Sequence, residues 1–494
     1  MPAPFASRAS LFQALAILSC LGLLAGCNLA PVYAQPTVQT PMAFKEQPPQ
    51  QARPSEDWKP AQPRDAMARG RWWEMFQDPD LDALEAQVAV GNQSLAAALA
   101  HFQAARAVVK QSQAQYYPTV TASPAVSRSR QFSPATANNP KPAPFTATSY
   151  SLPFDASWEP DFWGGIRNSV QASSLEAQAT FAELGNVRLT VQAEVAVDYF
   201  QLRVLDGQKQ LLDTAVQDYE ESLKLTQDQA NSGMASGQDV EQAATLLDTT
   251  RAQATDLGIQ RALLEHAIAT LLGRPASTFA IASRALDLKP VPVPVGVPSQ
   301  LLERRPDIAA AERRVAEANA RIGVARTAYF PTTLLGASVG YQGASLGNLV
   351  SGSNLLWSLG ASLTQTLFDG GKLKAITEQA RAAYQGTVAD YRQTVLGAFQ
   401  DVEDNLSTLR ILDMELRQQE AAVASSRRYL AFAVSRYQSG LDIYLDVITA
   451  QTSLLGNQRT AMGLLMQQMT ANVQLVKALG GGWDRSYTPA EAKP

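Results

Sequence analysis

Residues 388–409 read VADYRQTVLGAFQDVEDNLSTL, and apolar side chains recur there at spacings of three and four. This spacing is typical of a helix whose apolar seam packs against other helices, as in a coiled coil. Residues 184–205 (LGNVRLTVQAEVAVDYFQLRVL) carry the same stripe, 388 − 184 = 204 positions earlier. The sequence therefore predicts two long, matched helices in one chain.

The match extends well beyond these two helices. Gly233 and Asp239 recur as Gly440 and Asp446, 440 − 233 = 207 positions later, and Leu272-Gly273 recurs as Leu479-Gly480 at the same offset. Offsets that change this little across so many residues are the signature of an internal repeat. We therefore expect a tandem duplication, with an ordinary coiled-coil rod as the simpler alternative.

Breaks in the helical pattern at Gly and Pro give the expected organisation of the chain. The first repeat is expected over 80–290, with two strands in about 119–163, a long helix over 165–231 and a return helix over 238–272. The second is expected over 291–483, with helix 306–329, two strands in about 332–368, long helix 371–439 and return helix 443–479. Residues 27–79 are expected to form an extended N-terminal strap, and 484–494 a C-terminal tail.

The strand segments argue against a simple rod. In 355–366 apolar residues such as Trp357, Leu359 and Leu363 alternate with small or polar ones, a pattern typical of transmembrane β-barrel strands. About four strands per chain cannot close a barrel, because the smallest barrels need about eight and lipid tolerates no open edge. Several chains must then share one barrel, and a trimer supplies twelve strands.

Composition excludes several classes of protein. The 41 basic and 45 acidic residues give a net charge of −4, so the chain offers no basic field for nucleic acid. Two His and two Cys leave little for a metal site, a His-based catalytic relay or a disulfide framework. His101 and His266 lack partners at metal-ligand spacing, so we expect no metal site. No apolar run after the N-terminus is long enough for a multi-span helical membrane protein.

The N-terminus has the pattern of a lipoprotein precursor. Residues 1–26 hold Arg8 and the apolar run 11–24, as expected of a signal peptide, and end in Leu24-Ala25-Gly26 before Cys27. The lipobox pattern predicts an acyl chain on Cys27 as the one covalent group, with no other cofactor. Asn28 in place of Asp favours the outer membrane, where the lipid would tether the chain without spanning the bilayer.

Five motifs in order resemble the TolC-like outer-membrane factors, specifically the lipoprotein (OprM/NodT-like) branch serving RND-type efflux systems. They are CNLAPVYAQP at 27–36, WWEMFQDPDL at 72–81, LERRPDI at 302–308, YQSG at 437–440 with YLDV at 444–447, and LGGGW at 479–483. The resemblance covers essentially the whole mature chain.

The resemblance implies an α+β membrane protein without enzymatic activity. It would be a homotrimer with a twelve-strand barrel in the outer membrane of a Gram-negative bacterium, continued by a twelve-helix coiled-coil barrel in the periplasm and a mixed equatorial belt. Its partners would be a periplasmic adaptor, an inner-membrane RND-type transporter and outer-membrane lipid. The chain would passively export drugs or other small molecules.

The turns between long and return helices carry the candidate functional residues. Gly233, Gly237 and Gly440 mark the two turns, and the gate candidates near the second are Arg436, Tyr437, Asp442, Tyr444, Leu445, Asp446 and Thr449. Asp442, Leu445, Asp446 and Thr449 are expected on one helical face, where acidic or apolar rings would narrow a pore. The alternative is that Asp442 and Asp446 only cap the return helix.

A second motif is expected to be architectural. Arg304 and Arg305 precede Pro306, which suits a first helical turn, and Asp307 suits the positive end of the helix dipole. Trp72 and Trp73 are expected to be packing residues.

Three rival functions remain open on the sequence. One is a conduit of the same fold for type I protein secretion or metal-ion efflux. Another is a lipid-anchored periplasmic adaptor or scaffold, which would lack the alternating strands and the duplication. An outer-membrane hydrolase is disfavoured, because no nucleophile and base converge in any motif.

Overall fold

The structure is a computed structural model that describes residues 29–41, 43–46, 71–133, 143–284, 291, 293 and 304–481. Its described residues fall into two compact units. The first unit combines 1–36, 103–179 and 312–390, and the second combines 37–102, 180–311 and 391–494. The predicted signal peptide, Cys27 and the tail 484–494 lie outside the described residues.

The helices have equal lengths in the two halves of the sequence. In the first half α3 (Gln93–Ala114), α4 (Gly165–Asn231) and α5 (Gly237–Leu271) have 22, 67 and 35 residues. In the second half α7 (Pro306–Thr327), α8 (Lys372–Gln438) and α9 (Tyr444–Ala478) again have 22, 67 and 35 residues. These bounds lie within two residues of the expected ones. α2 (Pro79–Gly91) precedes the first set.

Five strands form one antiparallel sheet in the first unit. They are β1 (Thr119–Ala122), β2 (Ala125–Ser133), β3 (Ala143–Trp158), β4 (Thr332–Gly343) and β5 (Leu355–Thr364). β1 and β2 both pair with β3, which pairs with β4, which pairs with β5. The expectation of two strands in 119–163 was wrong in one detail, because the outer strand is divided. Pro124 separates β1 from β2, since proline has no N–H to donate to the ladder.

The strand register sorts side chains onto two faces of the sheet. Directly paired residues share a face, so Phe154, Val339 and Trp357 form one apolar row. Trp158, Leu335 and Ala361 form another row on that face. The opposite face carries the row Asp155, Ser338 and Ser358. Every residue of β5 is exposed within the chain, although half of that strand is large and apolar.

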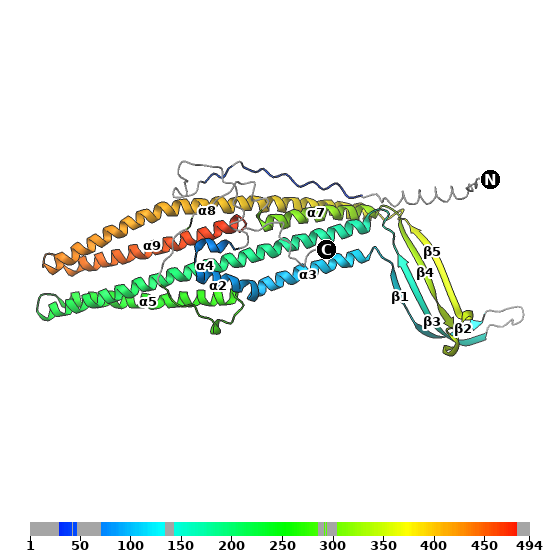
Figure 1. The fold of residues 1–494 in the computed structure, drawn as a ribbon, viewed down its shortest axis with the longest axis horizontal. Coiled ribbons are helices and arrows are strands. Elements are labelled where there is room, and N and C mark those ends of the chain that lie inside the picture. The colour runs from blue at the N-terminus through cyan, green and yellow to red at the C-terminus, as the bar shows by residue number, and fades with distance from the viewer. Residues whose placement is uncertain are drawn as a thin grey trace, which may run out of the picture. The chain divides into compact units, whose positions relative to one another are not determined.

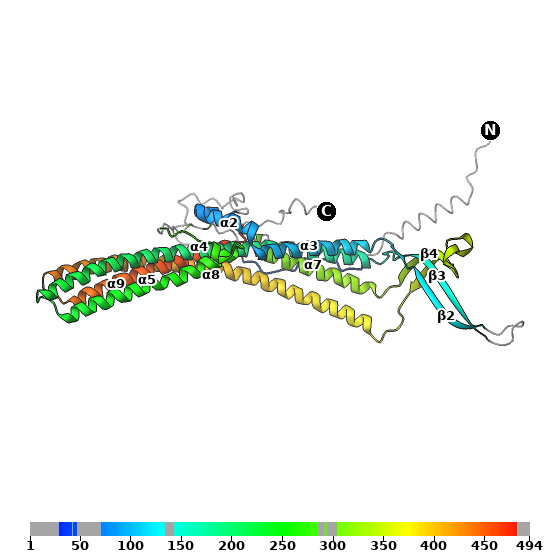
Figure 2. The ribbon, with the colours of Figure 1, turned by 90° about the horizontal axis from the view of Figure 1, so that it is seen from below.

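The core of the second unit lies where its helices meet. In Figures 1 and 2 the parts of α4, α5, α8 and α9 that belong to this unit run side by side. Trp72, Tyr199, Phe200, Ile268 and Leu406 are among its side chains with exposed fractions of 2% or less. Burying each large apolar side chain contributes roughly 1.5–3 kcal/mol. Trp72 and Trp73 are therefore packing residues, as expected.

In both halves a glycine of positive φ follows the C-terminal end of the return helix. Gly273 after α5 and Gly480 after α9 both have positive φ, +70° and +92°. A Cβ on Gly273 would lie 1.9 Å from the Gly91 carbonyl oxygen, and one on Gly480 would lie 2.4 Å from that of Arg304. Only glycine fits such a close backbone approach at positive φ. This explains why Leu-Gly recurs in the sequence.

Residues in the expected strap contact a helix within each unit. Tyr33 donates a hydrogen bond to Glu312 over 2.7 Å in the first unit, and the Lys45 amide donates to Glu403 over 2.7 Å in the second. The expectation of an extended strap over 27–79 was wrong near its C-terminal end. The 3-10 helix η2 (Trp72–Phe76) lies there, and α2 begins at Pro79 because the Asp78 side chain accepts hydrogen bonds from its first turn.

Three further 3-10 turns connect the elements: η3 (Ala276–Thr278), η4 (Leu346–Asn348) and η5 (Gly352–Asn354). Among the described helices, none combines the length and the hydropathy needed to cross a membrane.

Candidate functional site

The two turns between long and return helices lie together at one end of the second unit (Figure 1). We call residues 231–239 the first tip and residues 436–446 the second tip. The Tyr437 hydroxyl of α8 donates a hydrogen bond to Gln229 of α4 over 2.6 Å, which joins the two tips. Of the two partners in this bond, the sequence predicted Tyr437 as a candidate and did not predict Gln229.

A glycine of positive φ ends each long helix. Gly233 has φ +74° and Gly440 has φ +70°, and the amides that follow them reach back to carbonyls of the last helical turn. Met234 donates to Gln229 over 2.8 Å and Leu441 donates to Arg436 over 2.9 Å, as in a Schellman ending. Gly237 was expected in the turn, but it is the first residue of α5.

The first tip is held by a local backbone cap. The Ser236 side chain accepts a hydrogen bond from the Asp239 amide over 3.2 Å, and the Ser236 amide donates to the Asp239 carboxylate over 3.0 Å. This reciprocal pair is a capping box, which satisfies two otherwise unpaired donors at the start of α5. The signal Ser-x-x-Asp stood in the sequence and was missed there.

The second tip is held by an ion pair. Arg436 donates to both oxygens of Asp442, over 2.5 Å from Nε and 2.8 Å from Nη2. Hydrogen bonding from the Arg436 guanidinium lowers the pKa of the Asp442 carboxyl below its ordinary value. The residue that caps α9 is Ile443, which offers no side-chain hydrogen bond. The alternative in which Asp442 and Asp446 cap the return helix is therefore wrong.

Two tyrosines fix the second tip to the neighbouring helix. Tyr444 is only 2% exposed, and its hydroxyl lies 2.9 Å from the Ser222 hydroxyl of α4. Its ring lies 5.2 Å from that of Tyr437 and packs with Val447 and Ala450. Burial raises the pKa of Tyr437 above its ordinary value, so its phenol stays protonated as a donor. Tyr444 is thus a buried anchor between α9 and α4.

Of the four gate candidates expected on one helical face, Leu445, Asp446 and Thr449 lie in the first two turns of α9, but Asp442 does not belong to that helix. Asp442 lies two residues before α9, because that helix begins only at Tyr444. Leu445 and Thr449 are exposed and Asp446 is half-buried. Leu441 and Ile443, which the sequence reasoning passed over, are about two-thirds exposed beside Leu445. Leu441, Ile443 and Leu445 alternate with Asp442 and Tyr444 in the sequence. This alternation could have indicated that the turn before α9 is extended and exposes apolar side chains.

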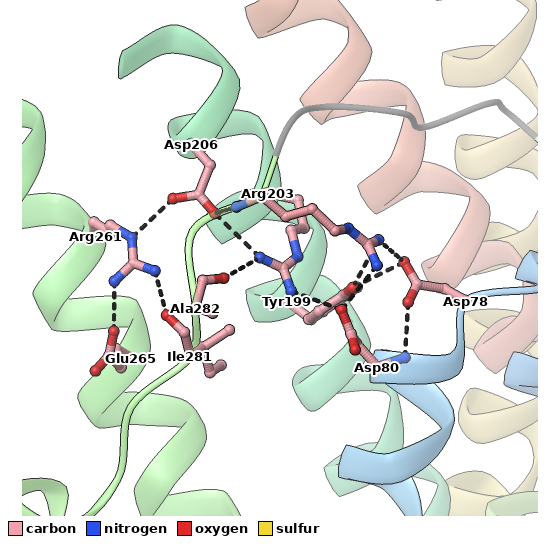
Figure 3. A network of polar contacts seen from close by, with 10 residues as sticks. Asp78, Asp80, Tyr199, Arg203, Asp206, Arg261, Glu265, Ile281 and Ala282 are labelled. Carbon is pink, nitrogen blue, oxygen red and sulfur yellow. Dashed lines mark hydrogen bonds and ion pairs between the residues drawn. The ribbon is translucent and has the colours of Figure 1, made fainter. Parts of the chain in front are cut away.

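A polar network in the same unit was also missed by the sequence (Figure 3). Arg203 of α4 reaches Asp80 over 3.0 Å and Asp206 over 3.2 Å, and Arg261 of α5 reaches Asp206 over 2.8 Å. Arg203 also donates to the Ala282 carbonyl over 2.7 Å. Arg203 and Asp206 are three residues apart on α4, but no spacing along the sequence links them to Asp80, Arg261 or Ala282, which three other segments supply.

Asp78 ties this network to the start of α2. Its side chain accepts from Tyr199 over 2.8 Å and pairs with Arg284 over 2.8 Å. Burial raises the pKa of the Asp78 carboxyl, but the hydrogen bonds from Tyr199 and Arg284 and the Arg284 charge outweigh it and leave the pKa lowered. The carboxylate is therefore ionised at neutral pH, and the network braces α2, α4 and α5.

The RRPD motif forms a second brace. Arg305 donates to both oxygens of Asp307, to Asp401 of α8 over 3.0 Å and to the Ala478 carbonyl of α9 over 3.2 Å. Pro306 is the first residue of α7, where its missing N–H costs nothing. These contacts join the start of α7 to α8 and α9.

Nothing in the described ranges resembles a metal centre, since no group of three or more His, Cys, Asp or Glu side chains there is placed to hold an ion.

Comparisons with known proteins agree with this architecture. The model of the family described as "Outer membrane efflux protein" matches residues 84–274 and again 297–481, one match in each half. The pyoverdine export outer membrane protein OpmQ of Pseudomonas aeruginosa is 33% identical over 430 residues, covering 85% of this chain and 89% of that protein.

Two more relatives cover nearly the whole chain. The toluene efflux pump outer membrane protein TtgF of Pseudomonas putida is 31% identical over 461 residues, covering 93% of this chain and 95% of that protein. The solved outer-membrane channel OprN has a TM-score of 0.82 at 27% identity, covering 92% of this chain and all of that one. These matches confirm the resemblance seen in the sequence and the expected role in outer-membrane efflux. The chain belongs to the outer membrane efflux protein family.

Proposed function

We propose that this chain is the outer-membrane channel of a tripartite efflux pump, which conducts small molecules passively from an inner-membrane transporter and its periplasmic adaptor to the exterior. The observation that carries the proposal is the open sheet of the first unit. Its outer strand β5 exposes Trp357 by 76%, Leu359 by 78% and Leu363 by 69%. An apolar face this exposed is what a lipid-facing barrel wall presents.

Closure of that sheet supports a homotrimer. Both edges of the β1–β5 sheet lack a partner strand within the described chain, and unpaired strand edges are not tolerated in lipid. The path β1/β2–β3–β4–β5 supplies four strand positions, and three chains supply 3 × 4 = 12. The polar face with Asp155, Ser338 and Ser358 would line the lumen.

The helices support a conduit that continues below the barrel. The long helices α4 and α8 and the shorter helices α3, α5, α7 and α9 of each chain would together contribute to a twelve-helix tunnel in the trimer. The equal helix lengths and the two family matches support an origin by tandem duplication. The second tip is the proposed periplasmic gate, with Arg436, Tyr437 and Leu445 holding it closed.

The relatives support the kind of cargo. Pyoverdine and toluene are small organic molecules, and the proteins that export them share most of their length with this chain. Conduits for type I secretion or metal ions remain the second candidate, because the fold alone does not select the cargo. A periplasmic adaptor or scaffold does not account for the apolar sheet face.

Size analysis of the full chain in mild detergent tests the trimer. We expect a particle of about three times the 53.2 kDa chain mass, resistant to dissociation until the β-structure melts. A particle of one chain that retains its β-sheet signal would contradict the proposal. In cells lacking their own outer-membrane efflux channel, expression with the cognate adaptor and transporter should restore resistance to small organic toxins.

The proposed acyl chain on Cys27 assists anchoring and does not form the pore. A Cys27→Ser variant behind a cleavable signal should still assemble in the outer membrane and support export, because the apolar sheet face supplies most of the membrane contact. Recovery of that variant as a soluble single chain would show that the sheet does not form a barrel.

A further inference from the structure

Charged residues are almost absent from the sheet. The five strands contain only Arg128, Arg130 and Asp155, of which Asp155 lies on the polar face. Arg128 pairs with Thr148 and Arg130 pairs with Thr146 in the β2–β3 ladder. Thr146 and Thr148 are an even number of residues from Phe154 on β3, so both arginines lie on the same face as the apolar rows.

A cation on a lipid-facing surface is costly near the bilayer midplane and tolerated only near the interface. The position of the two arginines along the strands is therefore informative. The apolar face extends from Trp158 to Tyr150 on β3, and at about 3.4 Å per residue this is roughly 27 Å along the strand. That length suits the apolar band of an outer-membrane barrel, which is about 25 Å tall.

The arginines lie just beyond that band. Arg128 is two positions past the Val126–Tyr150 pair and Arg130 is four positions past it. With strands tilted by about 40°, these steps correspond to roughly 5 and 10 Å above the band. Such heights fall in the headgroup layer of a bilayer. They lie at the sheet end away from the helices, because β1 follows α3 and β2 continues beyond β1 along β3 (Figure 1).

Both guanidinium groups are exposed and have no hydrogen bond or ion pair with any residue in the part of the chain that the structure describes. The threonines paired with them, Thr146 and Thr148, add hydroxyl groups on the same face. No acidic residue lies on that face of any described strand. The patch is thus uniformly suited to an anion.

We propose that Arg128 and Arg130 bind the phosphate groups of the phosphorylated glycolipid in the outer leaflet of the membrane. A guanidinium matches a phosphate with two parallel hydrogen bonds, and the threonine hydroxyls supply further donors. In the trimer three copies give 3 × 2 = 6 arginines around the barrel, which would fix its height in the membrane. This inference rests on the proposed barrel.

The test measures binding of diphosphoryl lipid A to the purified, full-length trimer in detergent by native mass spectrometry. The variant R128Q/R130Q should bind lipid A about tenfold more weakly than the parent, because charge-assisted contacts are lost. R128K/R130K should retain most of the binding, and each single Gln variant should show an intermediate loss. These milder variants keep the test valid if the double Gln variant assembles poorly.

A matched control removes the same two charges elsewhere. Arg427 and Arg428 are exposed on α8, and R427Q/R428Q should bind lipid A as the parent does. Equal weakening in both double variants would overturn the proposal, because net charge alone would then explain binding. Lipid A binding that is unchanged in R128Q/R130Q would also overturn it.

The source of the phosphate and the proposed barrel are tested separately. Inorganic phosphate at millimolar concentration should not displace lipid A, and displacement would show a site for free phosphate instead. Trimer mass and single-channel conductance are measured first on the same samples. A conducting trimer that binds lipid A without using these arginines overturns this inference alone, whereas a non-conducting monomer overturns the proposed function.

Discussion

The two tips share their backbone geometry and differ in what holds it. Both end a 67-residue helix with a glycine of positive φ and begin a 35-residue helix a few residues later. At the first tip Ser236 and Asp239 cap the return helix through its backbone. At the equivalent positions, 207 residues later, stand Ile443 and Asp446, and no side-chain cap forms.

This difference indicates which tip is able to move. A capping box belongs to the helix itself and breaks only when the first turn unwinds. The Arg436–Asp442 pair instead spans the turn, is largely exposed on the Arg436 side, and breaks without any change in helical structure. A partner that offers competing contacts to either residue would shift the second tip between existing states. The first tip would follow through the hydrogen bonds of Tyr437 to Gln229 and of Tyr444 to Ser222 on α4.

The largest expected effect comes from removing the contacts that hold the second tip. Arg436→Ser with Leu445→Ser should raise single-channel conductance several-fold in planar bilayers and leave the trimer intact. The ion pair to Asp442 is lost, and the exposed apolar side chain that would seal a narrow pore is replaced. Gln238→Ser is the control, because Gln238 occupies the place of Leu445 in the first tip (445 − 207 = 238). Parent-like conductance in the double variant would locate the constriction elsewhere.

A smaller effect is expected on ion selectivity. Asp442→Asn with Asp446→Asn should weaken the preference for cations in reversal-potential measurements, because acidic groups near a constriction attract cations. Asp248→Asn, on the exposed side of α5 and away from the tips, should leave selectivity unchanged. If the two sets of variants behave alike, the charges at the second tip do not line the pore.

Acidification should loosen the second tip selectively. The folded-state pKa of Asp442 is lowered below 3.8, so the ion pair contributes fully above that pH and is lost as the pH falls through the lowered value. Amide hydrogen exchange around Leu441 should therefore accelerate, relative to its intrinsic rate, below about pH 3.8. Asp442→Asn should abolish this pH dependence. A dependence that persists in the variant would assign it to another carboxyl.

The smallest effects come from exchanging the caps. Ser236→Ala should destabilise the first turn of α5 by about 1 kcal/mol, and Ile443→Ser should stabilise that of α9 by about 0.5–1 kcal/mol, since Asp446 then completes a capping box. Hydrogen exchange of the first-turn amides measures both changes. If Ile443→Ser leaves the exchange rates of these amides unchanged, the stability of the first turn of α9 depends on the tyrosine contacts and not on a side-chain cap.

The sequence located the candidate site well and its contacts poorly. The repeat offset and the glycines predict both tips to within a few residues, and one segment of the sequence contains Arg436, Tyr437, Asp442 and Leu445. The grouping of Asp442 with Leu445, Asp446 and Thr449 failed because helical periodicity was applied two residues before α9 begins. The partners Ser222 and Gln229 were not predicted, since they lie more than 200 residues away along the chain.

The sequence by itself determined the elements and their repetition: apolar periodicity and glycine positions follow from local backbone geometry, which acts within a few residues. Tertiary structure alone decided which groups pair across segments that are distant in the sequence. Arg261 of α5 reaches Asp206 of α4, and Arg305 reaches Asp401 and Ala478, because packing brings separate segments together. A buried charge without a partner is energetically costly, so it pairs with a group that the fold brings close to it. The spacing of residues along the sequence does not predict which group that is.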